Sequence, residues 1–234
     1  MEMRLHNFFV SEKLDGKNEI TIFDPSLINQ LRNVLRLHHG DKVILLDNSG
    51  SEFHVELVSF SPKMIHAKIL KTEKNKNIPK REVTLFQSLL KKDKLEWVFE
   101  KGTELGVSRF APALSERSEK KSFNVERAEK IIREAAEQSG RGTLPALHKV
   151  QNLKELMELS AKSPVAFHTE GEKIPDIFLS SHEPVSIFIG PEGGWTEKEI
   201  TFFKSKNIPI YCLGTQVLRA ETAAVSALSL FLLN

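Results

Sequence analysis

The chain has 234 residues, of which 40% are hydrophobic and 27% charged, as in an ordinary globular protein of one large or two small domains. Its 33 basic and 31 acidic side chains leave a formal net charge of +2, so charge alone does not indicate a nucleic-acid partner. The single cysteine excludes an internal disulfide, and no apolar segment is long enough to span a bilayer, so we expect a cytoplasmic protein without membrane contact.

Residues 1–72 are predicted to form a small β-barrel around one helix. Short apolar segments separated by turn residues are typical of such barrels. After the second of these segments, Asp24 followed by Pro25 is a helix start signal, and Gly40 is expected to end the helix.

Arg32 and Arg36 lie four residues apart on this predicted helix, so they are expected to share a face. Their guanidinium groups suit contact with phosphate oxygens. A solvated helix face is an equally good interpretation of the same pair.

Residues 73–81 are polar and basic, without hydrophobic periodicity, and are predicted to be an interdomain linker. Residues 82–234 then alternate strand-like and helical segments, which predicts an α/β domain with a mostly parallel sheet. Asp93 and Asn124 are expected to cap helices in this domain, and Leu153–Leu159 to form another.

Two glycine-containing loops follow buried strands in the last fifty residues. Val185–Ile189 runs into Gly190-Pro191-Glu192-Gly193-Gly194, and a second apolar segment runs into Leu213-Gly214. Thr196 and Glu199 form a capping-box signal for the helix after the first loop. Because ligands of open α/β sheets bind at the carboxyl ends of strands, the two loops predict a binding site, although tight turns would also explain the glycines.

The two loops resemble a known family in their detailed sequence. The run I-G-P-E-G-G, at 189–194, and the run L-G-x-x-x-L-R-x-E-T-A, at 213–223, are similar to the cofactor loops of SPOUT-class RNA methyltransferases. In particular they resemble the family that methylates N3 of a uridine in small-subunit (16S) ribosomal RNA. The likeness extends over essentially the whole chain, through further runs such as Thr103-Glu104-Leu105-Gly106-Val107.

The resemblance implies an architecture and a chemistry. The C-terminal domain would be an α/β trefoil knot, and the N-terminal domain a PUA-like RNA-binding barrel. The protein would be a homodimer that uses S-adenosylmethionine, needs no metal, and acts on the ribosomal RNA of the small subunit.

The resemblance also assigns residues to the cofactor. The main-chain and short side-chain groups of the two loops would hold it: Ile189, Gly190, Gly193, Gly194, Leu213, Gly214, Leu218, Thr222 and Ala223. From sheet topology, His168 and Thr169 are expected at the same pocket, because they follow a neighbouring strand.

Methylation of N3 requires removal of a proton and leaves negative charge on the uracil oxygens. Arg219 is the candidate for stabilising that charge, and Glu221 is the candidate general base, with Glu192 second. A purely structural role for Glu221 is equally well supported, since a carboxylate near a helix start interacts favourably with the helix dipole.

Contacts to RNA phosphates are expected from Lys91, Arg117 and Arg141, in addition to Arg32 and Arg36. The chain departs from the family pattern at Asn7, Asn29, Gln30, Lys92 and Gln216. Two other functions therefore stay open: a SPOUT enzyme that acts on tRNA or on a ribose 2′-hydroxyl, and a catalytically silent RNA-binding or assembly protein.

Overall fold

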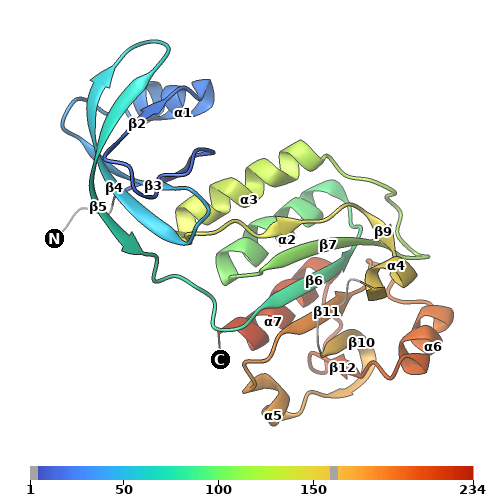
Figure 1. The fold of residues 1–234 in the computed structure, drawn as a ribbon. Coiled ribbons are helices and arrows are strands. Elements are labelled where there is room, and N and C mark those ends of the chain that lie inside the picture. The colour runs from blue at the N-terminus through green and yellow to red at the C-terminus, as the bar shows by residue number, and fades with distance from the viewer. Residues whose placement is uncertain (1–4, 159–162, 234) are drawn as a thin grey trace. The chain divides into compact units, whose positions relative to one another are not determined.

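The computed structural model describes residues 5–158 and 163–233, and the chain forms two compact units (Figure 1). The first takes in the chain up to Ile78 together with Ala136–Leu144, and the second takes in Pro79–Ala135 and Pro145 onward.

The first unit is built on one curled sheet of five strands. In the order β1-β3-β4-β5-β2, only β1 and β3 pair in parallel, and all other neighbours are antiparallel. Alternate residues, such as Val43 and Leu45, are fully buried, as expected for a sheet with one face on a core. The strands are β1 (Asn7–Phe9), β2 (Glu19–Ile22), β3 (Lys42–Leu46), β4 (Ser51–Phe60) and β5 (Ile65–Lys74).

The helix of the first unit begins where the sequence predicts but ends early. The Asp24 carboxylate accepts the Ser26 N–H at 2.8 Å, and α1 (Pro25–Asn29) follows. The chain then widens into a π-helical turn, η1 (Gln30–Val34), and Arg36 takes a left-handed φ of 56°. The predicted shared helical face for Arg32 and Arg36 is therefore wrong, because Arg36 lies beyond the helix.

A distant segment completes the first unit. The Phe9 N–H donates to Glu137 Oε1 at 2.9 Å, and the Asn75 side-chain amide donates to the Gly140 carbonyl at 2.8 Å. Ala136 is fully buried against Phe9 and Leu46. Residues 136–144 thus pack with the first unit although the chain reaches them only after most of α3 (Val125–Ser139).

The second unit contains a seven-stranded sheet in which every pair is parallel. Its order is β12-β10-β11-β6-β7-β8, and β9 also pairs with β7. The predicted α/β domain with a mostly parallel sheet is confirmed. The strands are β6 (Val83–Ser88), β7 (Arg109–Leu114), β8 (Ala146–Leu147), β9 (Gln151–Asn152), β10 (Pro164–Lys173), β11 (Val185–Ile189) and β12 (Ile210–Cys212).

Helices cover both faces of this sheet. Along β6, Val83 and Leu85 pack into a core shared with α2 and α7, whereas Phe86 packs into a second core with residues of α4 and α6. Because both faces of the sheet are buried, its central strands are mainly apolar along their length and do not alternate regularly with polar residues. The helices are α2 (Lys92–Leu105), α3, α4 (Leu153–Glu158), α5 (Asp176–Leu179), α6 (Glu197–Ser205) and α7 (Ala220–Leu232), while Leu159 lies outside the described residues.

Two helix starts test the capping predictions. The side-chain oxygen Oδ1 of Asn124 accepts the Arg127 N–H at 2.9 Å, as predicted for the start of α3. At α2, by contrast, the N-cap is Lys91 and Asp93 lies within the first turn. An aspartate in the first turn also interacts favourably with the helix dipole. This explains why Asp93, predicted as the cap, lies two residues after the true N-cap.

Arg81, expected in a solvated linker, is buried in the second unit. Its Nε donates to the Glu183 carbonyl at 2.6 Å, and its guanidinium lies 5.0 Å from the centre of the Phe231 ring. Burial lowers the pKa of the guanidinium. The aromatic ring explains the placement, since it stabilises a desolvated cation.

Candidate functional site

The two glycine loops of the second unit and the middle of β10 enclose one cavity of about 290 Å³. In the sheet, β10 lies directly between β11 and β12, so the loops that follow those strands flank it. The cavity is lined by Arg117, Phe167, His168, Thr169, Ile189, Gly190, Pro191, Glu192, Gly193, Gly194, Trp195, Leu213, Gly214, Gln216, Val217, Leu218, Ala220 and Ala223.

Glycines allow the two loops to adopt backbone conformations that other residues rarely take. Gly194 and Gly214 have φ values of +66° and +124°, a region that other residues rarely adopt. A Cβ at either position would meet no described atom within 4 Å, so the backbone there faces open space. At Gly190 a Cβ would instead come within 3.3 Å of the Trp195 ring.

Side chains hold the first loop in place. Trp195 is buried and donates from Nε1 to the Phe167 carbonyl of β10 at 3.1 Å. On the other side, Arg117 donates from Nη1 to the Gly193 carbonyl at 2.8 Å. The loop is therefore held both by the middle of β10 and by the segment that follows β7.

Glu199 connects the start of α6 to the segment after β7. It is 6% exposed, and its two carboxylate oxygens accept the N–H groups of Thr196 at 2.8 Å and Glu116 at 2.9 Å. The Thr196 hydroxyl in turn accepts the Glu199 N–H, so the predicted capping box is confirmed.

Replacement of Glu199 by alanine is expected to destabilise the protein by about 2–3 kcal/mol, because two partly buried N–H groups lose their acceptor. Urea denaturation followed by circular dichroism measures this free energy. Glu197→Ala is the control, since Glu197 lies exposed in the same helical turn. Equal losses in the two variants would contradict the role given to Glu199.

The structure brings together nearly all the residues predicted for the cofactor. Thr222 is the exception: it is exposed, because Ala220 and Ala223, one helical turn apart, are the α7 residues that face the cavity. Sequence reasoning did not assign Phe167, Pro191, Trp195, Val217 or Ala220 to the cofactor. Trp195 directly follows the first glycine run, which was the one signal that could have found it.

Beside the cavity, one lysine lies between two carboxylates. Lys94 Nζ is 3.6 Å from Glu192 Oε1 and 3.6 Å from Glu221 Oε2. Among the described residues no hydrogen-bond donor reaches Glu221 Oε2, which is buried. Lys94 on α2 is not predicted, because nothing in the local sequence indicates partners 98 and 127 residues away.

Arg219 and the predicted RNA-binding residues differ in exposure. Arg219 is exposed at the N-cap of α7 and does not line the cavity. Lys91, with its ammonium 3.6 Å from Glu119, is exposed, as is Arg117. In the first unit, Arg32 and Arg36 are also exposed.

Arg141 is different, because it is only 5% exposed. Its burial lowers the pKa of the guanidinium to about 10. A phosphate contact by Arg141 requires this guanidinium to be accessible to RNA, so Arg141 is left out of the contacts proposed below.

The fold and the cavity define the class of protein. The second unit has the SPOUT methyltransferase fold, and the curled sheet of the first is PUA-like. Residues 76–232 match the family model described as an RNA methyltransferase domain, and residues 31–70 match the RNA methyltransferase PUA domain. The chain belongs to this RNA methyltransferase family.

Similar proteins have a more particular name. A ribosomal RNA small subunit methyltransferase E from Bacillus subtilis is 34% identical over 220 residues, which cover 86% of this chain and 85% of the relative. The protein of that name from Rickettsia conorii is 28% identical over 233 residues, covering 97% and 95%. The crystal structure of the Neisseria gonorrhoeae enzyme bound to S-adenosyl methionine superposes with a TM-score of 0.86 at 27% identity, covering 97% and 96%.

Proposed function

We propose that the chain transfers the methyl group of S-adenosylmethionine to N3 of a uridine in small-subunit ribosomal RNA. The observation that carries this proposal is the cavity between two glycine loops, in a chain whose relatives are named as small-subunit ribosomal RNA methyltransferases.

The residues of the cavity suit this cofactor. Its volume of about 290 Å³ is at the lower end of ligand pockets. Ile189, Leu213 and Leu218 offer an apolar wall for an adenine ring, and the Gly194 carbonyl and the backbone of Gly214 offer hydrogen-bonding groups, while the Gly194 N–H donates to the Pro191 carbonyl. When bound, the cofactor supplies an electrophilic methyl group on a sulfonium sulfur.

The chain's own residues then have to position the base and remove its N3 proton. Glu221 is proposed as the general base, since its buried Oε2 has no hydrogen-bond donor among the described residues. Lys94 keeps that carboxylate oriented from 3.6 Å. Arg219, exposed on the surface, stabilises the negative charge left on the uracil oxygens or holds an adjacent phosphate.

Glu221→Gln is expected to lower kcat by about 10²–10⁴, the usual contribution of a general base, while cofactor affinity is retained. Methyl transfer to ribosomal RNA in single-turnover assays measures the rate. Glu192→Gln is the matched variant, because Glu192 shares Lys94 but lines the cavity. If Glu192→Gln loses the rate and Glu221→Gln does not, the base is Glu192.

The remaining partners are proposals of the same kind. Arg32, Arg36, Lys91 and Arg117 are proposed to contact phosphates of the RNA, which predicts binding that weakens as salt is raised. A homodimer in the cytoplasm is proposed as the working form, and light scattering after gel filtration tests the dimer. Within the described parts of the chain, no helix combines the length and the apolarity needed to cross a bilayer.

Nucleoside mass spectrometry of ribosomal RNA and of transfer RNA, each purified from a strain that lacks the gene, tests the proposed reaction. We expect one N3-methyluridine to disappear from small-subunit RNA and to return when the gene is restored. Loss of a methyl group from tRNA or from a ribose, or no loss at all, would overturn the proposal and favour another SPOUT activity or a silent RNA-binding protein.

A further inference from the structure

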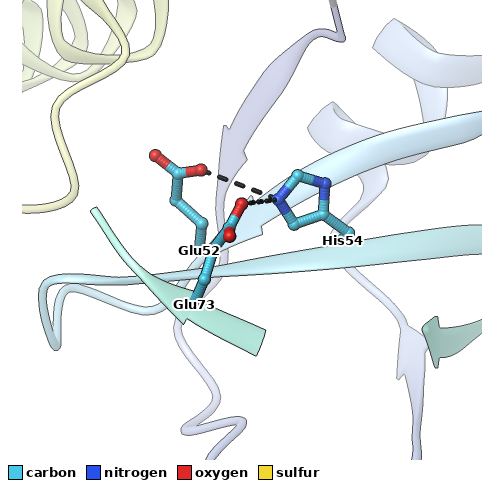
Figure 2. Close-up of side chains that lie close together, drawn as sticks. All are labelled: Glu52, His54 and Glu73. Atoms are coloured by element: carbon cyan, nitrogen blue, oxygen red, sulfur yellow. Dashed lines mark hydrogen bonds and ion pairs between the residues drawn. The ribbon is translucent and has the colours of Figure 1, made fainter. Parts of the chain in front are cut away.

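Three metal-ligating side chains converge on the sheet of the first unit, outside the site described above (Figure 2). Glu52 and His54 alternate along β4, so they lie on one face of the sheet, and Glu73 of β5 is paired directly opposite Glu52. His54 Nε2 is 2.9 Å from Glu73 Oε1 and 3.7 Å from Glu52 Oε2. The ligand atoms of the three all lie within 4.8 Å of one another.

The second oxygen of each carboxylate is held by another donor. The Asn75 amide donates to Glu52 Oε1 at 2.6 Å, and Lys71 Nζ lies 2.6 Å from Glu73 Oε2. One oxygen of each carboxylate is thereby left to face the imidazole. Outer partners of this kind orient metal ligands in established sites.

We propose that Glu52, His54 and Glu73 form a binding site for a divalent transition-metal ion such as Zn²⁺. Bonds of about 2.0–2.2 Å in a tetrahedron place neighbouring ligand atoms about 3.4 Å apart, and the two distances to His54 Nε2 lie on either side of this value. One imidazole and two carboxylates suit Zn²⁺ or Mn²⁺ better than a soft ion. Three protein ligands leave one position for water.

Charge supports the same assignment. The hydrogen bond from Lys71 lowers the pKa of the Glu73 carboxyl, which therefore stays ionised as a ligand must be. Lys71 is paired opposite His54 on β5, and the segment 136–144, which packs with the first unit, carries Glu137 and Arg141. Two carboxylates beside one imidazole form a ligand set whose negative charge a divalent cation would compensate.

The sequence predicts that methyl transfer needs no metal. The site proposed here goes beyond that expectation, because it lies outside the site of methyl transfer. It lies on a different unit from the cofactor cavity, and its proposed effect is structural. The ion would join β4 to β5 and, through Glu52 and Asn75, fix the Gly140 carbonyl of the segment 136–144.

Isothermal titration of ZnCl₂ into the untagged full-length protein, and thermal unfolding with and without zinc, test this proposal. At about pH 7.5 we expect one equivalent to bind and to raise Tm. His54→Gln and Glu73→Gln should each weaken the affinity for zinc by about tenfold or more.

The control variants are His66→Gln and Glu56→Gln. His66 lies on β5 but contacts Thr21, and Glu56 lies on β4 outside the cluster. Both controls should bind zinc as the unmodified protein does. Absence of binding, undiminished affinity in His54→Gln, or equal losses in the controls would overturn the site. A Tm that falls in His54→Gln while zinc has no effect on either protein would show an ion pair only, and would also overturn it.

Discussion

Gly190→Val is expected to reduce affinity for S-adenosylmethionine at least 100-fold, which corresponds to about 2.7 kcal/mol. Gly190 lines the cavity, and even a Cβ there would lie 3.3 Å from the Trp195 ring. Because Trp195 is itself fixed to Phe167, the added methyl groups have to occupy the cavity or displace the ring. Isothermal titration with the cofactor measures the loss.

Gly190→Ala is the graded companion of this variant and should lose less affinity. Gly40→Ala, which changes a glycine in the first unit, should bind as the unmodified protein does. Near-ultraviolet circular dichroism reports whether the surroundings of Trp195 survive. Unchanged affinity in a correctly folded Gly190→Val protein would contradict the assignment of the cofactor to this cavity.

Arg219→Ala is expected to lower kcat by about 10²–10³, equivalent to about 2.7–4 kcal/mol, if the guanidinium acts as an oxyanion donor. Cofactor affinity should be unchanged, because Arg219 does not line the cavity. Single-turnover methylation of ribosomal RNA, together with titration of the cofactor, separates the two effects.

Arg219→Lys tests whether a positive charge alone supports the rate. Its kcat should lie between those of Arg219→Ala and the unmodified protein, because lysine keeps the charge but lacks the planar guanidinium fork. Lys206→Ala, at the exposed end of α6, is the control for loss of a surface cation. A normal rate in Arg219→Ala would remove Arg219 from the proposed mechanism.

Much of the fold could be predicted because its signals are local. Asp24 with Pro25, Asn124, and Thr196 with Glu199 act within one helical turn, and each of these starts is found where the sequence places it. The parallel sheet follows from alternating strands and helices. The glycine runs at the ends of β11 and before α7 line one cavity, as expected from the topology of parallel sheets.

The features that could not be predicted depend on distant partners. The contact of Glu137 with Phe9 spans 128 residues, and that of Arg81 with the Glu183 carbonyl spans 102. Arg36 leaves the helix because a π-helical turn intervenes, which the apolar spacing does not reveal. Similarly, Glu52 and Glu73 become neighbours only through the register of β4 with β5.

A crystal structure of the protein with S-adenosylhomocysteine tests the account most directly. We predict ligand density in the cavity, with the adenine between the two glycine loops and the backbone of Gly194 and Gly214 facing it. Density at another place on the molecule, or loops closed on their own side chains at saturating ligand, would contradict it.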